Sequence, residues 1–312
     1  MDKESLLETR RRISPYVHNT PVFTSTLLDE IAGAKLFFKC ENFQKMGAFK
    51  MRGAANAILQ LTKEQQERGV VTHSSGNFAQ ALSLAAKKLG VTAYIVMPNN
   101  APSVKKGAVL DYGGIITDCE PNIDAREQAA QQIVAEKGAT FIHPSNDLDV
   151  ILGNATSAME LLEVHSNLDF MVSPVGGGGL LAGTALAAHY FGNKCLVVGG
   201  EPKAVDDAFR SLKSGQIETN VSSETIADGL RTQLGDINFP ILQSYVDHIV
   251  CVEEHEIIKA MKLLWERLKI VVEPSSAVAF AAVLKEKAYF KDKKVGIILS
   301  GGNVDLETIK FS

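Results

Sequence analysis

Short apolar runs rich in β-branched residues alternate along the chain with longer stretches in which apolar residues recur every three or four positions. The short runs have the length and composition of strands and lie at 36–39, 70–74, 93–97, 115–119, 140–143, 170–174, 196–200, 248–252 and 295–300. The longer stretches, among them 78–90, 125–138 and 256–269, have the spacing of amphipathic helices. This alternation predicts an α/β fold in which helices cover both faces of parallel sheets.

The chain of 312 residues has no low-complexity linker between these elements. The strand–helix units between Val70 and His143 follow one another closely enough to form a compact unit of their own. We therefore expect a small domain at 70–144, inserted into a larger, discontinuous domain formed by 1–69 and 145–312.

Composition and charge narrow the class of protein. Lysine and arginine number 32 against 36 acidic residues, a formal net charge of −4, which argues against a nucleic-acid partner. The cysteines at 40, 119, 195 and 251 form no C-x-x-C pair and have apolar neighbours, as expected of buried reduced thiols. Residues 1–15 have no apolar signal core and no run is long enough to span a bilayer, so we expect a cytoplasmic protein with no membrane partner.

A run of four glycines, Gly176, Gly177, Gly178 and Gly179, lies between an apolar strand and an apolar helix. Residues without Cβ let the backbone turn tightly and bring successive N–H groups against an anion, and the following helix adds its positive N-terminal end. A flexible linker is the ordinary alternative, but linkers are rarely flanked by a buried strand and an apolar helix. We interpret the segment as a phosphate cradle without a Walker lysine.

Two further polar loops, SSGN at 74–77 and SGGN at 300–303, also follow predicted strands. Ligand sites of open α/β sheets lie beyond the carboxyl ends of the strands, so the three loops predict one common cleft. His73 and His143 end strands beside this cleft and are as compatible with a structural role as with a functional one.

Lys50 lies between Phe49 and Met51 at the start of a predicted helix. An isolated lysine is usually a solvated surface charge. Here the apolar neighbours and the positive helix end would both lower its pKa, which favours an amine able to form an imine. A Schiff-base lysine combined with a phosphate cradle points to pyridoxal 5′-phosphate as the cofactor.

The chain resembles the fold-type II pyridoxal-phosphate enzymes, and among them the serine racemases, serine/threonine dehydratases and 3-hydroxyaspartate dehydratases. The resemblance extends from Thr20 to Asn303 and rests on FKMRGA at 49–54, SSGN at 74–77, PVGGGG at 174–179, ETIADG at 224–229, EPSSA at 273–277 and LSGGN at 299–303. Each motif alone is a weak signal, whereas the set is specific. The resemblance implies two open, twisted, mostly parallel sheets covered by helices, with the smaller domain inserted into the larger, and a homodimer.

The resemblance also implies roles for single residues. Lys50 would hold the cofactor covalently and then remove or return the substrate Cα proton on one face. Gly176–Gly179 would bind the phosphate, Asn77 the phenolic oxygen and Ser300 the pyridine nitrogen, with Phe49 packed near the ring. A neutral serine does not force that nitrogen to be protonated, so the ring is a weaker electron sink. Elimination or reprotonation then suits the site better than transamination.

Ser75 is a turn serine or a helix N-cap on sequence grounds alone. In serine racemases the matching serine is the acid/base on the face opposite the lysine, and racemisation requires two such bases. We expect the N–H groups of Ser74, Ser75, Gly76 and Asn77 to bind the substrate carboxylate. Arg126 matches an arginine that reaches substrate in serine racemases, although a surface helix arginine is the default, and Arg231 is a further candidate for the cleft.

Glu201 and Asp207 lie in an oxygen-rich loop after a strand, where solvated acids are the ordinary interpretation. Serine racemases bind Mg²⁺ or Ca²⁺ at this motif, which implies a metal site formed by Glu201, Asp207 and the carbonyl of Val205. Some serine racemases also bind ATP at the subunit interface, so ATP is a candidate effector. Segments 25–27 and 45–46 lie where such contacts would arise.

Three positions depart from the family pattern: Ala48 replaces the usual serine, Phe78 the usual histidine, and Asn154 the usual glutamine. They leave the lysine, the cradle and the pyridine partner in place but reshape the pocket. We predict an ammonia-lyase acting on L-serine, L-threonine or 3-hydroxyaspartate, with accompanying serine racemisation. The alternatives are a protein that is principally a serine racemase, a β-replacement enzyme, and a ligand-binding homologue without catalysis.

Overall fold

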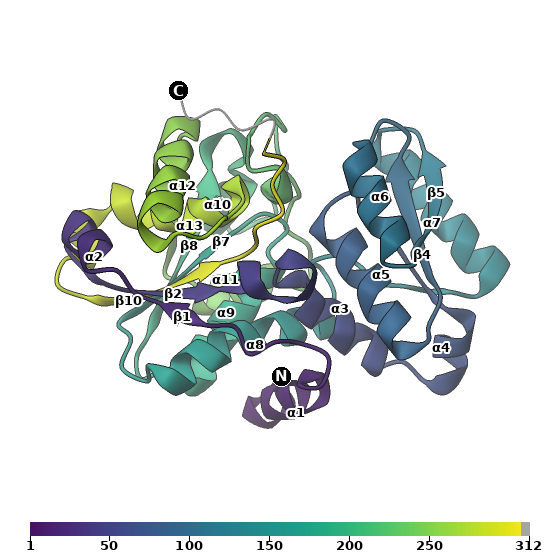
Figure 1. Ribbon diagram of the computed structural model, residues 1–312, viewed down its shortest axis with the longest axis horizontal. Coiled ribbons are helices and arrows are strands. Elements are labelled where there is room, and N and C mark those ends of the chain that lie inside the picture. The colour runs from purple at the N-terminus through teal and green to yellow at the C-terminus, as the bar shows by residue number, and fades with distance from the viewer. Residues whose placement is uncertain (307–312) are drawn as a thin grey trace.

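The computed structural model of the protein describes residues 1–306 and contains two sheets (Figure 1). The larger sheet has six strands in the order β1-β2-β10-β7-β8-β9, in which only the pairing of β1 with β2 is antiparallel. Its strands are β1 (Val22–Phe23), β2 (Lys35–Cys40), β7 (Phe170–Pro174), β8 (Leu196–Pro202), β9 (His248–Val252) and β10 (Lys294–Leu299).

The smaller sheet has four parallel strands in the order β5-β4-β3-β6. Its strands are β3 (Val70–His73), β4 (Ala93–Pro98), β5 (Ile115–Cys119) and β6 (Thr140–Phe141). The predicted α/β class and two mostly parallel sheets are thereby confirmed. Nine of the strands were predicted from apolar runs, while β1 has only two residues and is too short to show such a run.

The helices alternate with the strands along the chain. They are α1 (Lys3–Ile13), α2 (Thr26–Ala32), α3 (Lys50–Leu59), α4 (Lys63–Arg68), α5 (Asn77–Leu89), α6 (Ser103–Asp111), α7 (Ile123–Lys137), α8 (Leu148–Val164), α9 (Gly179–Phe191), α10 (Asp207–Ser214), α11 (Phe239–Tyr245), α12 (Glu254–Leu268), α13 (Pro274–Lys285) and α14 (Lys287–Phe290). None of the helices among residues 1–306 is long and apolar enough to cross a membrane.

Both faces of the larger sheet are buried. Along β10, Val295 and Ile297 pack with α12 and α13 in one apolar cluster, whereas Ile298 packs with α8 and α9 in another. Successive side chains of a strand point to opposite faces, which explains why these strands appear in the sequence as continuous apolar runs. Figure 1 shows α12 and α13 on one side of the sheet and α8 and α9 on the other.

Helix α3 lies between the two sheets (Figure 1). Its residues Met51, Ala54 and Ile58 pack in one apolar cluster with Phe78 of α5 and Val150 of α8. The helix that begins at Lys50 therefore contacts elements of both sheets. The boundaries of the two predicted domains, at 69/70 and 144/145, stay a prediction.

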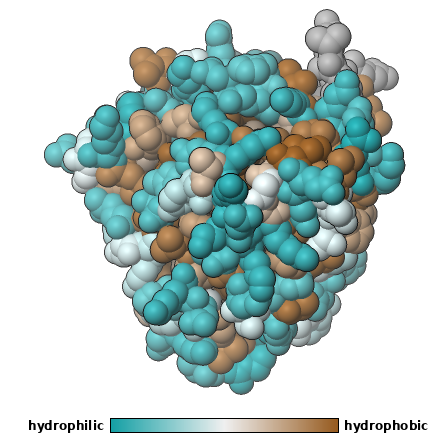
Figure 2. Space-filling model, turned by 90° about the vertical axis from the view of Figure 1, so that its left-hand side faces the viewer, coloured by the Kyte–Doolittle hydropathy of each residue, from teal (hydrophilic) through white to brown (hydrophobic). Residues whose placement is uncertain are grey.

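Figure 2 views the face of the larger sheet's lobe that carries α2, and this face is mostly hydrophilic with small scattered apolar patches. Single exposed apolar side chains of this kind are normal on a folded protein. Cys40 is buried, while Cys119, Cys195 and Cys251 are half-buried, and all four thiols are free.

A charged cluster ties the edge strand β9 to the end of α13. His248 Nδ1 lies 2.7 Å from Asp247 Oδ2, and His248 Nε2 lies 2.9 Å from Glu286 Oε2. Tyr289 also donates to Asp247 at 2.8 Å. Because both ring nitrogens face carboxylate oxygens, the arrangement favours a proton on each nitrogen, which is the imidazolium form.

This cluster predicts a pH-dependent stability. Burial alone would lower the pKa of His248, but the hydrogen bonds and charges of Asp247 and Glu286 outweigh it and raise the pKa. The stabilisation is therefore complete below the unfolded-state pKa of histidine, about 6.5, and is lost as pH rises through the higher folded-state value. We expect His248→Gln to destabilise the protein by about 1 kcal/mol at pH 6 and by less at pH 9, measured by urea unfolding. A difference that is constant with pH would contradict this.

Candidate active site

Lys50 is positioned by a turn that is hydrogen-bonded to the loop after β10. Phe49 N–H donates to the Ser300 carbonyl at 3.0 Å, and Gly302 N–H donates to the Gly47 carbonyl at 2.9 Å. Gly47 has a φ of +79°, which a residue with a Cβ rarely adopts, so a glycine is suited to this turn. The structure thus brings Lys50, Phe49 and the buried Ser300 together, as the sequence predicted for the cleft.

The amine of Lys50 lies in a mostly apolar surrounding. Its Nζ donates to the Pro144 carbonyl at 2.6 Å and lies 5.1 Å from the Phe49 ring centroid and 5.5 Å from that of Phe78. Burial lowers the pKa of Lys50 to about 8, against a smaller opposing effect of the Glu273 charge. A substantial neutral fraction near neutral pH makes this amine a nucleophile and a base.

Asn77 is held in place by two residues from distant parts of the chain. Its amide donates to the Glu273 carboxylate at 2.9 and 3.1 Å, and its Oδ1 accepts from Asn303 Nδ2 at 2.8 Å. Asn303 also donates to the Met46 carbonyl at 2.8 Å, next to the turn that carries Lys50. Glu273 and Asn303 belong to motifs visible in the sequence, but nothing there assigned them a role at the site.

Glu273 is buried, and burial raises its pKa to about 7 despite the hydrogen bond from Asn77, with a further rise from the Asp228 charge. Asp228 forms an ion pair of 2.5 Å with Lys105 of α6, which connects the larger lobe to the smaller sheet. The carboxyl group that orients Asn77 is therefore close to half-protonated at neutral pH.

The glycine run follows β7 and leads into α9. Gly178 has a φ of +79°. A Cβ at Gly176 would lie 2.6 Å from Leu230 Cα, and a Cβ at Gly177 would lie 2.3 Å from Ser145 Oγ, so both positions are too crowded for a side chain. Within residues 1–306, no protein acceptor is found for the N–H groups of Gly176, Gly177 and Gly178. A tight turn with free N–H groups at the start of a helix has the properties of an anion site.

The loop 143–146 links the lysine to the glycine run, and only its first residue, His143, was placed beside the cleft from the sequence. Pro144 accepts from Lys50, and Ser145 packs on Gly177 and Gly179. His143 Nδ1 accepts from the N–H groups of Ser145 and Asn146 at 3.1 and 2.8 Å. Burial, helped by the charges of His73 and Lys50, lowers the pKa of His143 to about 4, so this ring is neutral and organises the loop.

Ser74 and Ser75 lie between β3 and α5, with Gly76 and Asn77 following. Ser74 N–H donates to the Val96 carbonyl at 3.2 Å, and Gly76 N–H lies 3.4 Å from Ser74 Oγ. Ser75 is half-buried and makes no hydrogen bond to any residue that the structure describes. Its hydroxyl is thus available to a ligand, and the N-terminal end of α5 favours an anion nearby.

Arg126 lies on α7, where its charge acts on His73 and Cys119. Its Nε is buried without a hydrogen-bond partner among the described residues. The His73 ring lies 5.9 Å from that of His143. No hydrogen bond joins the side chains of Arg126 and Lys50 among the described residues, and the role of Arg126 toward substrate stays a prediction.

Glu201 and Asp207 are both buried beside α10. Glu201 accepts from the N–H groups of Ala208 and Phe209, and Asp207 accepts from Leu234 N–H and Asn220 Nδ2. Burial, with repulsion by Asp207, raises the pKa of Glu201 well above its usual range, and burial raises that of Asp207 to about 6. No cluster of three or more His, Cys, Asp or Glu side chains suited to a metal is found in residues 1–306.

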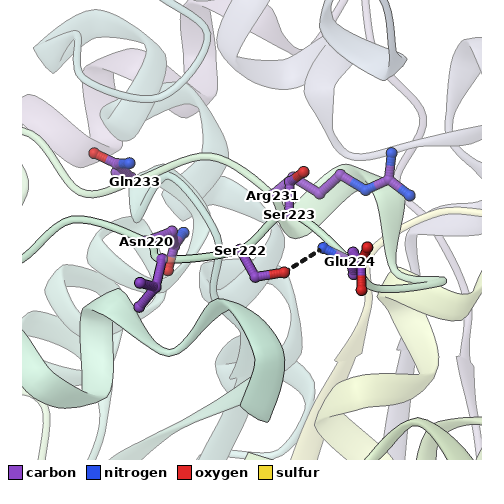
Figure 3. A pocket seen from close by; sticks show the side chains of 7 residues that line it. Asn220, Ser222, Ser223, Glu224, Arg231 and Gln233 are labelled. Carbon is purple, nitrogen blue, oxygen red and sulfur yellow. Dashed lines mark hydrogen bonds between the residues drawn. The ribbon is translucent and has the colours of Figure 1, made fainter.

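An open hollow with a volume of about 490 Å³ lies beside this region. Figure 3 shows the side chains that line it. The hollow is lined by Asn220, Val221, Ser222, Ser223, Glu224, Arg231 and Gln233. The residues that alternate with Arg231 and Gln233 contact the glycine run instead. They are Leu230, Thr232 and Leu234. Segment 230–234 therefore separates the hollow from the anion site, and Arg231, which donates to the Thr225 carbonyl at 2.7 Å, lines the hollow.

Comparisons with known proteins agree with this geometry. A family model described as pyridoxal-phosphate dependent enzyme matches residues 13–301. Serine racemase from Dictyostelium discoideum is 49% identical over 98% of this chain and 96% of that protein. The β-hydroxyaspartate dehydratase of Paracoccus denitrificans is 46% identical over 99% of this chain and 98% of that protein. The structure of T.th. threonine deaminase has a TM-score of 0.93 at 42% identity, covering 98% of this chain and 99% of that one.

Two mostly parallel sheets, with a lysine-bearing helix between them and a glycine loop at a strand end, define the class of fold-type II enzymes. The chain belongs to the family of pyridoxal-phosphate dependent enzymes. The predicted family, fold class and dependence on pyridoxal phosphate are confirmed, whereas the predicted metal, ATP and the roles of single site residues stay predictions.

Proposed function

We propose that the protein is an ammonia-lyase that converts a small 3-hydroxy amino acid to a 2-oxo acid and ammonia, with serine racemisation as a second activity. The observation that carries this proposal is the Lys50 amine, with its pKa lowered to about 8, beside an anion-binding glycine loop and an unpaired Ser75. Its relatives named serine racemase, β-hydroxyaspartate dehydratase and threonine deaminase support the substrate class.

The residues present fit pyridoxal phosphate. The N–H groups of the glycine run suit its phosphate, Ser300 its pyridine nitrogen and Asn77 its phenolic oxygen, with Phe49 beside the ring. Bound pyridoxal phosphate supplies an electron sink that makes the substrate Cα–H bond acidic. Because Ser300 is a neutral hydroxyl, the site favours elimination or reprotonation over transamination.

The protein's own residues would transfer protons, bind the substrate carboxylate and hold Asn77 in position. Neutral Lys50 Nζ accepts the Cα proton on one face, and Ser75 Oγ donates or accepts a proton on the other. The N–H groups at the start of α5 hold the substrate carboxylate. Glu273 and Asn303 keep Asn77 in position, and Phe78 excludes water from Lys50.

A panel of L-serine, L-threonine and 3-hydroxyaspartate tests the proposal when 2-oxo acid, ammonia and inverted amino acid are measured together. We expect 2-oxo acid from at least one substrate and D-serine from L-serine. D-serine far in excess of pyruvate would make the protein principally a racemase, and sulfide consumption with O-acetylserine would indicate β-replacement. No turnover of any substrate by cofactor-loaded protein would indicate a ligand-binding homologue.

The pKa of Lys50 predicts how cofactor capture depends on pH. With a pKa of about 8, the neutral fraction rises from about one tenth at pH 7 to about one half at pH 8. We expect the rate of covalent capture of pyridoxal phosphate, trapped with borohydride, to rise about fivefold over this interval and to level off above pH 9. A rate that continues to rise beyond pH 10 would show an unperturbed lysine.

Glu201, Asp207 and the Val205 carbonyl suit a divalent cation, Mg²⁺ or Ca²⁺, because they are oxygen donors and neither buried carboxyl group forms an ion pair with a lysine or arginine among the described residues. The role of the cation would be structural. Metal is first removed with EDTA, and the cation is then added back to a free concentration of about 100 times its Kd. We expect this addition to stabilise the protein by about 2.7 kcal/mol, measured as a rise in Tm. Asp207→Asn should abolish this rise and Asp206→Asn should keep it; an equal rise in both would contradict the site.

Three finer features belong to the same proposal: a homodimer, ATP as an effector at its interface, and a cytoplasmic location. The resemblance to serine racemases motivates the dimer and ATP, whereas the cytoplasmic location follows from the sequence prediction above. Arg126 is the candidate cation for the second carboxylate of 3-hydroxyaspartate. Unchanged 3-hydroxyaspartate kinetics in Arg126→Ala would exclude that role.

A further inference from the structure

Four charged side chains meet in the interior behind α3: Lys39, Glu41, Arg52 and Glu160, here called the charged quartet. Arg52 and Glu41 are fully buried, Lys39 is 1% exposed and Glu160 is 6% exposed. They come from β2, the 3₁₀ turn Glu41–Phe43, α3 and α8. Two positive and two negative charges make the quartet neutral, yet none of them takes part in the chemistry proposed above.

Arg52 is the centre of the quartet. Its Nε and Nη2 donate to the two Glu41 oxygens at 2.7 and 2.9 Å, and its Nη1 and Nη2 donate to the two Glu160 oxygens at 2.7 and 2.8 Å. Lys39 Nζ completes the arrangement by donating to Glu160 Oε2 at 2.6 Å. Two bidentate pairs fix the plane and the place of the guanidinium group, which a single contact would not do.

Stability alone does not explain such a cluster. Removing four charges from water largely offsets their mutual attraction, and well-packed apolar residues often serve a folded protein equally well. The quartet instead holds the Arg52 side chain, and therefore this position of α3, in one fixed orientation. Lys50 lies two residues before that position, at the first position of the same helix.

The side chains of Lys50 and Arg52 project from roughly opposite sides of α3, because two residues correspond to a rotation of about 200° around the helix axis. Lys50 reaches the Pro144 carbonyl, while Arg52 reaches the quartet, and Arg52 N–H donates to the Phe49 carbonyl at 2.9 Å within the same turn. An extended lysine places Nζ roughly 8 Å from the helix axis, so a helix rotation of about 10° moves Nζ by more than about 1 Å. A misplacement of about 1 Å can lower a rate about 100-fold.

We propose that the charged quartet is a positioning device: Glu41 and Glu160 hold Arg52, which fixes the rotation of α3 and with it the place of Lys50 Nζ. Arg52 is a positioning residue because its contacts are with protein groups away from Lys50. The inference rests on the proposed role of Lys50 and adds a group of residues that acts through it.

The test uses Arg52→Lys, which keeps the charge but cannot form two bidentate pairs. Covalent capture is measured with pyridoxal, which lacks the phosphate and so reports Lys50 without the glycine run, and is fixed with borohydride. We expect the capture rate of Arg52→Lys to fall about 100-fold, with a shifted pH midpoint. A fourfold variant with methionine at 39, 41, 52 and 160 should fold, melt no lower than Arg52→Lys, and show the same loss of capture.

Ile58→Ala is the matched control, since Ile58 is buried on the same helix and its loss leaves a cavity without touching the first turn. It should lower Tm and keep the wild-type capture rate and pH midpoint. Capture at the wild-type rate by Arg52→Lys, or an equal loss in Ile58→Ala, would overturn the positioning role alone. Failure of the wild-type protein to be captured at Lys50 would overturn the proposed function together with this inference.

Discussion

Replacing Lys50 with alanine is expected to lower both 2-oxo acid formation and exchange of the substrate Cα proton by at least about 10⁴-fold. The Nζ of Lys50 lies 5.1 Å from the Phe49 ring centroid and 5.5 Å from that of Phe78, and it donates to the Pro144 carbonyl. Its loss removes the group to which we assign the Cα proton. Steady-state kinetics and deuterium incorporation from solvent measure the two losses separately.

Lys87→Ala is the control for this variant. Lys87 lies on α5, is exposed, and its Nζ also donates to a backbone carbonyl, that of Asp111 at 3.2 Å. Its replacement should leave turnover within about threefold of wild type. Equal activity of wild type and Lys50→Ala on every hydroxy amino acid would refute the assignment of Lys50 as the base.

Much of the fold could be predicted from the sequence because the inner strands β2, β10, β7 and β8 of the larger sheet are buried on both faces. Runs such as 170–174 and 295–300 are therefore continuous and apolar, and turn residues bound them. The convergence of the 74–77 loop, the glycine run and the 300–303 loop was predicted as well, because ligand sites of open α/β sheets lie beyond the carboxyl ends of the strands.

The partners that refine the site could not be predicted in this way. Asn77 and Glu273 are 196 positions apart in sequence, and Arg52 and Glu160 are 108 apart, so no local pattern relates them. Pro144 contributes only its carbonyl oxygen, a group that every residue has. Such contacts follow from how α3 and α8 pack, and close packing leaves no periodic signal in the chain.

Three groups around the site share one physical trend. Burial is the largest influence on Lys50, Glu273 and His143, and it moves their pKa values to about 8, 7 and 4, in each case toward the neutral form. Buried pairs elsewhere, such as Arg52 with Glu41, stay charged because bidentate partners compensate for the lost water. The charged quartet on one side of α3 thus stays ionised, whereas the titratable groups around Lys50 are shifted toward their neutral forms.

Ser75→Ala is expected to separate the two proposed activities. Racemisation needs a proton donor on the face opposite Lys50, whereas elimination needs only the base on the lysine side. D-serine formation from L-serine should therefore fall at least about 100-fold, while pyruvate formation stays within about threefold of wild type.

Ser83→Ala serves as the control for Ser75→Ala, because Ser83 lies on α5, the helix that follows Ser75, and its hydroxyl donates to the Ala79 carbonyl at 2.8 Å. Chiral chromatography and a coupled pyruvate assay on the same samples give the ratio of the two products. A parallel loss of both activities would make Ser75 a substrate-binding residue. Unchanged D-serine formation would assign the second proton to another group, and the unpaired hydroxyl at 75 would then be a turn serine only.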